Sequence, residues 1–428
     1  MKLSDDEKAM LNGDSGAAKQ KAMELLVRYA QALGCEEFVN TTNVAGVPGS
    51  TTPFLANYYK DYPGGADKIF AYFDLDSDEL VEVPAVVTNS CHLQAGYDPD
   101  NWEVLGASPE AAALSRSSEN YAADRGIKIL KTCTPYLAGN VPSMGEHCAW
   151  MESSAVIYCN SVLGARTNTE GRESTSAAML TGKIPNFGFH LDANRLGTHH
   201  IVVETKIESI MDWGMLGYFI GDAVQEYIPV VTGIDKTPDL VRYKHFGAAA
   251  ASSGGVEMYH IVGSTPEAPS LEAAFGRNQP REVIKYGEAE RRATYENLNA
   301  NGKSADVDYV MLGCPHASVE QIALACELLD GRHISDNCRL WVFTSRAVRQ
   351  QADAAGYCDI IRKAGGHVLT DTCSAIGQAL PPGTKVVALD SAKQVHYLPA
   401  IMNIEAWFGT TADCINAALT GRWTGALN

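Results

Sequence analysis

The sequence predicts an α/β protein made of several domains with mostly parallel sheets. The chain has 428 residues, enough for two or three domains of about 150 residues each. Its last third alternates short apolar runs with helical patterns, as parallel sheets covered by helices require. Two of those helical patterns open on a capping box, in which Ser or Thr is followed three positions later by Gln or Asp.

The N-terminal region begins with two expected helices. Ser4 and Glu7 make a capping box, and a second helix is expected to end at Gly34. Its apolar stripe consists of Ala22, Leu25, Leu26, Tyr29 and Leu33. Residues 41–65 are rich in Gly, Pro, Thr and Asn and predict an irregular loop, whereas the valine-rich run 81–87 predicts a strand.

The middle of the chain is dense in Gly, Asn, Thr, Ser and His between short apolar runs. This texture, over residues 126–200, is typical of loops that line a site. Strands are expected at 127–130 and 201–203, and a buried helix within 209–229. Prolines within 264–290 indicate a boundary. The expected domains are an N-terminal α/β region (1–125), a central domain with substrate loops (126–265) and a C-terminal α/β domain (266–428).

The last third has the clearest pattern of alternating elements. Strands are predicted at 307–312, 340–343, 367–369 and 386–389. Helices are expected after the capping boxes Ser318/Gln321 and Thr410/Asp413 and after the cap Ser345.

Composition argues against several classes of protein. A net charge of −17 and the lack of a Lys/Arg run argue against a nucleic-acid-binding surface. No stretch approaches the ~20 apolar residues that span a membrane. The first residues are acidic and lack an apolar core, so we expect a cytoplasmic protein with mostly reduced cysteines. Motifs for nicotinamide, nucleoside triphosphate, zinc-protease and serine-hydrolase chemistry are missing from the sequence.

Three of the eleven cysteines follow predicted strands directly. Cys133, Cys314 and Cys373 each leave a strand into a turn-prone segment, the position where sites form in open α/β sheets. Three thiolates brought together hold an iron–sulfur cluster or a single metal and leave a position open for substrate. The alternative is three unrelated buried thiols, and the spacing alone does not decide between the two interpretations.

Two polar segments are further candidates. The loop 164–171 places Arg166, Asn168 and Glu170 between glycines, which suits a clamp for a carboxylate but also an ordinary turn. His147 and His190 are candidates for acid–base groups or for hydrogen-bonded structural histidines.

These segments together resemble the large subunit of aconitase X over nearly the whole chain. The matching residues are Leu11–Gly13, Thr132–Leu137, Gly145–His147, Glu152–Val156, Asn160–Asn168, Gly188–Arg195, Leu312–His316, Asp371–Cys373 and Trp407–Thr410. The resemblance implies an aconitase-like fold with α/β domains around a central cleft. It also implies iron, as an iron–sulfur cluster or a mononuclear centre, at Cys133, Cys314 and Cys373, two of which lie in the C-terminal domain.

The resemblance further implies a lyase that acts with a partner. The family's large subunit works with a small swivelling subunit of about 130–150 residues that carries a catalytic serine. Known activities are dehydration of cis-3-hydroxy-L-proline and of mevalonate 5-phosphate. We expect the first substrate or an analogue, because no Lys/Arg-rich phosphate site is visible. Alternatives are the phosphomevalonate reaction, a non-catalytic iron-binding protein, and a chain that binds no metal.

Under this resemblance, the site residues divide into two groups. We expect catalytic roles for His147, Arg166 and Glu170. Substrate-binding roles are expected for Asn43, Ser153, Asn168, Arg195 and His316. Asn43 stands where many family members carry a histidine, a change that bears on substrate identity.

Overall fold

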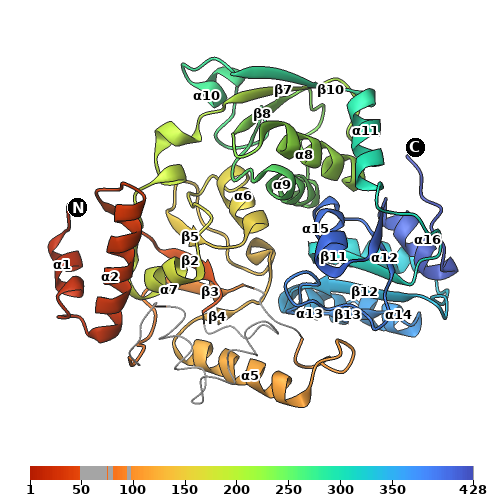
Figure 1. Ribbon diagram of the computed structural model, residues 1–428, viewed down its shortest axis with the longest axis horizontal. Coiled ribbons are helices and arrows are strands. Elements are labelled where there is room, and N and C mark those ends of the chain that lie inside the picture. The colour runs from red at the N-terminus through yellow and green to blue at the C-terminus, as the bar shows by residue number, and fades with distance from the viewer. Residues whose placement is uncertain (49–74, 76–80, 94–97, 428) are drawn as a thin grey trace.

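The computed structural model describes residues 1–48, 75, 81–93 and 98–427. These residues form three domains, each built on a parallel sheet with helices packed on it (Figure 1). The several parallel-sheet domains predicted from the sequence are therefore confirmed. Within the described ranges, the search for a helix long and apolar enough to cross a membrane finds none.

The first domain contains a four-stranded parallel sheet with the order β4-β3-β2-β5. Beside it, β1 pairs antiparallel with β6. The predicted capping box of Ser4 and Glu7 begins α1, and the predicted apolar stripe lies on α2, which packs against α7. The elements are α1 (Asp5–Leu11), α2 (Ala17–Ala32), β1 (Phe38–Asn40), β2 (Asn43–Gly46), β3 (Asn89–His92), α5 (Pro109–Asp124), β4 (Lys128–Ile129), η2 (Pro135–Leu137), β5 (Cys148–Trp150), α6 (Ser153–Ser161), α7 (Arg172–Thr181), β6 (Lys183–Pro185), η3 (Gly188–His190) and η4 (Asp192–Arg195).

Two local predictions in this domain are wrong. Residues 81–87, all of them described, form no strand, and β3 begins only at Asn89. Pro84 has no backbone N–H to give to a sheet, so this segment buries Val81 and Val83 without joining one. The loop predicted over 41–65 is wrong at its start, where β2 forms a fully buried inner strand. Residues 49–65 of that prediction lie outside the described residues.

The second domain carries a parallel sheet with the order β10-β7-β8-β9. The strand predicted at 201–203 and the helix predicted within 209–229 are confirmed as β7 and α8. Because β10 pairs with β7, one sheet continues past residue 265, where the sequence placed a boundary. The elements are β7 (His199–Val203), α8 (Ile210–Val224), β8 (Pro229–Thr232), α9 (Leu240–Gly254), β9 (His260–Ile261), α10 (Leu271–Phe275), β10 (Glu282–Tyr286) and α11 (Glu288–Leu298).

The third domain is a five-stranded parallel sheet with the order β13-β12-β11-β14-β15. All four predicted strands and both predicted capping boxes are confirmed, whereas α14, α15 and β15 were not predicted. The elements are β11 (Tyr309–Ala317), α12 (Val319–Leu329), β12 (Arg339–Thr344), α13 (Arg346–Ala354), α14 (Tyr357–Lys363), β13 (His367–Leu369), β14 (Val386–Leu389), α15 (Ala392–Met402), β15 (Glu405–Phe408) and α16 (Thr411–Thr420).

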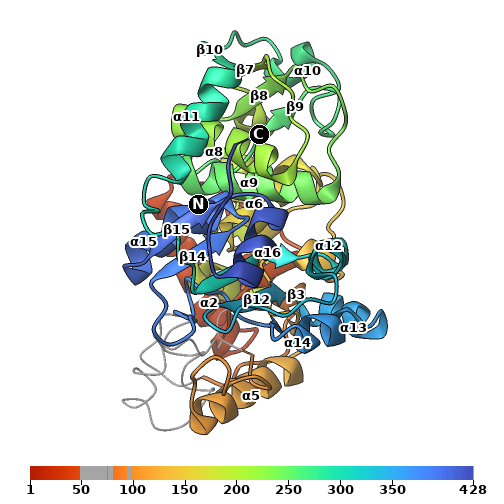
Figure 2. The ribbon, with the colours of Figure 1, turned by 90° about the vertical axis from the view of Figure 1, so that its right-hand side faces the viewer.

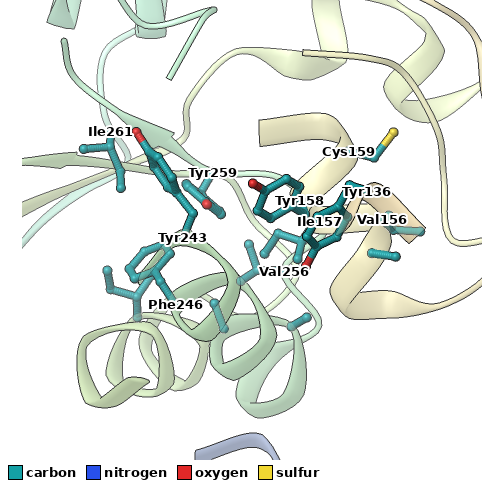
Figure 3. Close-up of a cluster of buried hydrophobic side chains, with 14 of the residues drawn as sticks. Tyr136, Val156, Ile157, Tyr158, Cys159, Tyr243, Phe246, Val256, Tyr259 and Ile261 are labelled. Carbon is teal, nitrogen blue, oxygen red and sulfur yellow. The ribbon is translucent and has the colours of Figure 1, made fainter. Parts of the chain in front are cut away.

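The second domain is closely packed, both between its own helices and against the other two domains. On α8, a Cβ at Gly217 would lie 2.2 Å from the carbonyl oxygen of Phe246, so only glycine lets α8 and α9 approach this closely. Both helices also contact α15 of the third domain, and Figures 1 and 2 show them below the second-domain sheet. Toward the first domain, an aromatic cluster fills the junction (Figure 3). In it Tyr136 and Tyr158 stack with ring centroids 3.7 Å apart.

Candidate iron and substrate site

The three candidate cysteines lie beyond or at the carboxyl ends of parallel strands. Cys133 follows β4, Cys373 follows β13, and Cys314 lies in the irregular end of β11. Gly313 precedes Cys314 with φ +92°, and a Cβ there would lie 2.1 Å from the Phe343 carbonyl oxygen. Cys133 and Cys314 are buried, and Cys373 is half-buried. The strand-end position that the sequence indicated is therefore where the structure places all three thiols.

His316 connects the loops that carry these three cysteines. Its backbone N–H donates to Cys133 Sγ at 3.2 Å. Its imidazole Nδ1 lies 2.9 Å from the Thr132 hydroxyl, and its Nε2 lies 3.0 Å from the Thr372 carbonyl oxygen. Thr132 and Thr372 immediately precede Cys133 and Cys373. One buried side chain on the Cys314 loop thus joins the other two loops across the interface between the first and third domains.

A half-buried ion pair lies beside the thiols. Lys393 Nζ is 2.6 Å from Glu152 Oε1, and Glu152 also caps α6 through the Ala155 N–H at 2.8 Å. Burial alone lowers the pKa of Lys393, but the charges of Glu152, Cys314 and Cys133 outweigh it and raise that pKa above its usual range. Sequence reasoning named Glu152 only within a motif and missed Lys393 altogether.

A second buried lysine supports the Cys314 loop from the second domain. Lys244 on α9 donates to the carbonyl oxygens of Pro315 and His316 at 3.1 and 2.7 Å, and to Gln321 Oε1 at 2.6 Å. Burial lowers the pKa of Lys244 to about 8, although the nearby Cys133, Asp390 and Cys314 raise it in part. The loop is therefore tied to all three domains.

The donor set fits a metal with thiolate ligands. Burial raises the pKa of the Cys314 thiol to about 12, the Cys373 charge adds to this, and Lys393 opposes it. Burial also raises the pKa of Cys133 well above its usual value, and Glu152 and Cys314 add to this. Buried thiols with such pKa values become thiolates when a cation binds them. Within the described residues, no three His, Cys, Asp or Glu side chains are already arranged as the ligands of one metal ion.

His147 and Arg166 lie near the amino ends of the parallel strands in the first-domain sheet, whereas Cys133 lies beyond the carboxyl ends. His147 precedes β5 and forms a bridge to Arg166, whereas Trp150, at the carboxyl end of β5, bridges to Thr169. At ~3.3 Å per residue, the length of β5 separates the amino end of this sheet from its carboxyl end by roughly 10 Å. His147 Nδ1 lies 3.0 Å from His190 Nδ1. The structure therefore brings His147 together with Arg166 but not with the cysteines.

The guanidinium of Arg166 is already occupied. Its Nη1 donates to the His190 carbonyl oxygen at 2.9 Å, and its Nη2 pairs with the exposed carboxylate of Asp192. Asn168 likewise accepts from the Phe189 N–H at 2.9 Å and donates to the Phe187 carbonyl oxygen at 3.1 Å. These contacts hold the 164–171 loop against residues 187–192.

Asn43 and Arg195 are engaged in buried networks. Asn43 exchanges two hydrogen bonds with Asn140, at 2.6 and 3.1 Å, and accepts one from Trp150 Nε1 at 2.9 Å. Arg195 pairs with Glu267 at 2.6 Å and donates to carbonyl oxygens of the surrounding loops. Ser153 is half-buried at the first position of α6, beside Glu152.

Glu170 lies near the carboxyl end of β5, as Glu152 does. Its N–H donates to the Trp150 carbonyl oxygen at 2.9 Å, and its Oε2 accepts from Ser174 Oγ at 2.7 Å. Burial raises the pKa of Glu170 to about 7, with Glu257 adding to the shift and hydrogen bonds from Ser174, Tyr29 and Asn168 opposing it. A carboxyl group with this pKa exchanges protons near neutral pH.

Comparisons with known proteins agree with this architecture. Models of the aconitase X first, second and third domains match residues 1–193, 197–296 and 307–420. The chain is 34% identical over 424 residues to the phosphomevalonate dehydratase large subunit of Methanocaldococcus jannaschii, covering 97% of this chain and 99% of that one. It is 33% identical to the cis-3-hydroxy-L-proline dehydratase of Pseudomonas aeruginosa, covering 97% of this chain and 70% of that one.

A solved structure is similar over the whole chain. The holo-form of aconitase X from Thermococcus kodakaraensis superposes with a TM-score of 0.80 at 28% identity, covering 98% of this chain and 100% of that one. The matched relatives are dehydratases, and the family models together span all three domains. The chain therefore belongs to the aconitase X family and is a hydro-lyase.

Proposed function

We propose that the chain is the large subunit of an iron-dependent dehydratase, with iron held by Cys133, Cys314 and Cys373. The observation that carries this proposal is the set of bonds that His316 makes to both other cysteine loops. The half-buried Lys393 and the buried Lys244 support it, because these cations offset the negative charge of thiolates. We propose an iron–sulfur cluster, with a single iron as the alternative, since cysteine thiolates bind either.

The proposed reaction removes water from a small β-hydroxy acid. A base takes the proton next to the carboxylate, the C–O bond breaks as the C=C bond forms, and the departing hydroxyl takes up a proton and leaves as water. Iron, when bound, supplies a Lewis acid for the departing hydroxyl. Glu170 is our candidate for the base, because its pKa near 7 lets it accept a proton at neutral pH and it lies near the carboxyl end of β5. His316 acts by holding the iron-bearing loops in place.

We propose that the residues near the amino ends of the strands support the site and do not contact the reacting atoms. Arg166, His147 and Asn168 hold the 164–171 loop, from which Glu170 extends. Asn43 and Arg195 are bonded within the protein and keep neighbouring strands and loops in place. Ser153 is the exception, because it adjoins Glu152 near the thiols.

We propose cis-3-hydroxy-L-proline or a close analogue as the substrate, because the sequence shows no Lys/Arg-rich phosphate site. Mevalonate 5-phosphate is the second candidate, and a specific observation favours it. The chain matches a phosphomevalonate dehydratase large subunit over 99% of that chain but only 70% of a cis-3-hydroxy-L-proline dehydratase. The same full-length match to proteins named as large subunits supports a heterodimer with a small subunit that carries the catalytic serine. The free cysteines and the need for reduced thiols support a cytoplasmic location.

The test is a dehydration assay on the chain co-expressed anaerobically with a small subunit from the same organism. We expect loss of water from cis-3-hydroxy-L-proline and little turnover by Glu170→Gln, with Glu226→Gln on the surface as the matched control. Turnover of mevalonate 5-phosphate alone would transfer the assignment to the second substrate. An iron-loaded complex inactive on both compounds would overturn the assignment and leave a non-catalytic iron-binding protein.

A further inference from the structure

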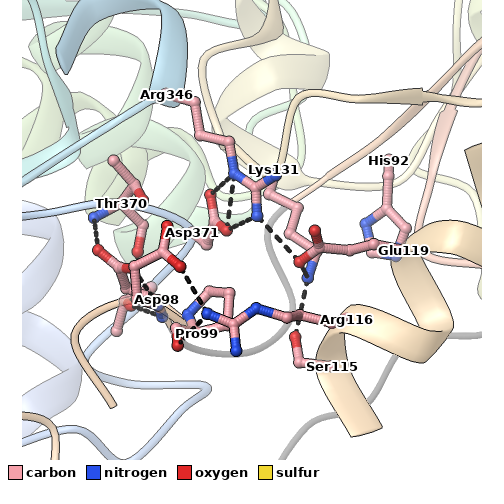
Figure 4. A network of polar contacts seen from close by, with 12 residues as sticks. His92, Asp98, Pro99, Ser115, Arg116, Glu119, Lys131, Arg346, Thr370 and Asp371 are labelled. Carbon is pink, nitrogen blue, oxygen red and sulfur yellow. Dashed lines mark hydrogen bonds and ion pairs between the residues drawn. The ribbon is translucent and has the colours of Figure 1, made fainter. Parts of the chain in front are cut away.

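A chain of four charged side chains crosses the interface between the first and third domains (Figure 4). Lys131 Nζ lies 2.6 Å from Glu119 Oε1, and the same oxygen accepts from Arg346 Nη2 at 2.9 Å. Arg346 in turn binds both carboxylate oxygens of Asp371, with Nε 2.9 Å from each. Glu119 comes from α5 and Arg346 from the start of α13, so this shared oxygen is one of the links between the two domains.

The two end members of this row of charged side chains occupy equivalent places in the two cysteine loops. Lys131 and Asp371 each stand two residues before a candidate ligand, in Lys131-Thr132-Cys133 and Asp371-Thr372-Cys373. Both have left-handed backbone conformations, with φ +42° and +60°, which non-glycine residues seldom adopt. Such a conformation persists only where surrounding contacts hold it. The bonds of the Lys131 and Asp371 side chains are among the contacts that hold these two turns.

The next position of each loop is joined in the same manner. Thr132 and Thr372, one residue before the cysteines, both bond to His316. The loops of Cys133 and Cys373 are thus linked twice, by the ionic chain at the second preceding residue and by His316 at the first. Burial differs among the four charged side chains: that of Asp371 is 0% exposed and that of Lys131 4%, against 39% for Arg346. Glu119, at 13%, is half-buried and lies between the two cations.

We propose that Glu119 and Arg346 are positioning residues, which through Lys131 and Asp371 hold the turns that set the separation of Cys133 and Cys373. This inference rests on the proposed function, because it assigns the two cysteines to one iron site. Neither Glu119 nor Arg346 touches a thiol, so their effect reaches the metal only through the turns.

The experiment compares Glu119→Gln, Arg346→Gln and Arg346→Lys in the full chain. Matched controls are Glu110→Gln, exposed on the same helix as Glu119, and Arg362→Gln, in an exposed ion pair of α14. The first readout is titration of metal-free chain with Co²⁺, followed by thiolate-to-cobalt charge-transfer absorption. We expect 10- to 100-fold weaker binding and a shifted spectrum for Glu119→Gln and Arg346→Gln, the range typical of lost supporting contacts around a metal site, with partial recovery in Arg346→Lys.

A second readout needs no metal. Hydrogen exchange of the metal-free chain should quicken at residues 131–134 and also at 371–374 in Glu119→Gln, although the substitution lies only in the first domain. Wild-type Co²⁺ binding and unchanged exchange in 371–374 for this variant would overturn the positioning role. If wild-type chain binds neither Co²⁺ nor iron but the exchange response appears, the iron assignment fails while the link between the turns stands.

Discussion

The backbone N–H of His316 donates to the sulfur of Cys133 at 3.2 Å, across a separation of 183 residues. The bond places the loop of Cys314 directly on that of Cys133, and the imidazole of His316 extends the same link to the loop of Cys373. An N–H donated to sulfur stabilises its thiolate, so this bond both positions Cys133 and favours the thiolate form that binds metal.

His316→Ala should therefore weaken iron binding more than it weakens the fold. Loss of the imidazole removes the bonds to Thr132 and Thr372, and we expect a 10- to 100-fold loss of metal affinity. Iron content after anaerobic purification measures this, with circular dichroism to confirm folding. The exposed His333→Ala is the matched control. Wild-type iron in His316→Ala would refute the bridging role.

Breaking the half-buried pair of Lys393 and Glu152 should destabilise the chain. Lys393→Met leaves the partly exposed carboxylate of Glu152 without its cation, so we expect a loss below the about 3–5 kcal/mol that removing one partner of a fully buried pair costs. The double variant Lys393→Met/Glu152→Gln should recover part of that loss, since no unpaired charge remains. Urea unfolding of the two variants and of wild type provides the comparison. Equal stability of the single variant and wild type would show that water reaches the pair.

The pKa of Glu170 predicts a pH dependence of stability. Burial raises this pKa from 4.5 to about 7, so between these values the folded chain binds more protons than the unfolded chain. Stability contributed by this group is therefore full below the lower value and falls as pH rises through the upper one, by up to ~3 kcal/mol. Glu170→Gln should flatten that part of the stability–pH curve, whereas Glu226→Gln should not. Parallel curves for wild type and Glu170→Gln would contradict the shift.

Two glycines on α8 should respond in opposite directions to alanine. A Cβ at Gly217 would lie 2.2 Å from the Phe246 carbonyl oxygen, whereas at Gly214 the nearest atom is 3.6 Å away. Gly217→Ala should cost about 1–3 kcal/mol through overpacking of α8 on α9. Gly214→Ala should gain roughly 0.5–1 kcal/mol, because alanine favours helix. Thermal unfolding of both variants tests the close approach, and a stable Gly217→Ala protein would contradict it.

The strand ends that carry the cysteines were predictable, whereas the contacts between them were not. Short apolar runs and capping boxes such as Ser318/Gln321 are local signals, and the structure follows them in the third domain. The run at 81–87 misled because valine content outweighed the effect of Pro84 on pairing. Lys393 had a usable signal, since Asp390 to Gln394 is a polar stretch directly after a buried strand.

Partners far apart in sequence account for the rest. Lys393 and Glu152 are 241 residues apart, and Arg346 and Glu119 are 227 apart, so neither pair leaves a local pattern. For Arg166 the sequence indicated a guanidinium able to bind a carboxylate. It did not show that Asp192 and the His190 carbonyl already occupy that guanidinium.

The most direct test of the iron site is anaerobic iron and sulfide analysis of the chain and its serine variants. The account predicts iron and sulfide in wild type, their loss in Cys133→Ser, Cys314→Ser and Cys373→Ser, and wild-type content in Cys326→Ser, a buried cysteine in the core of the third domain. Iron retained at wild-type level in all three of those serine variants, or absent from anaerobically purified wild type, would contradict it.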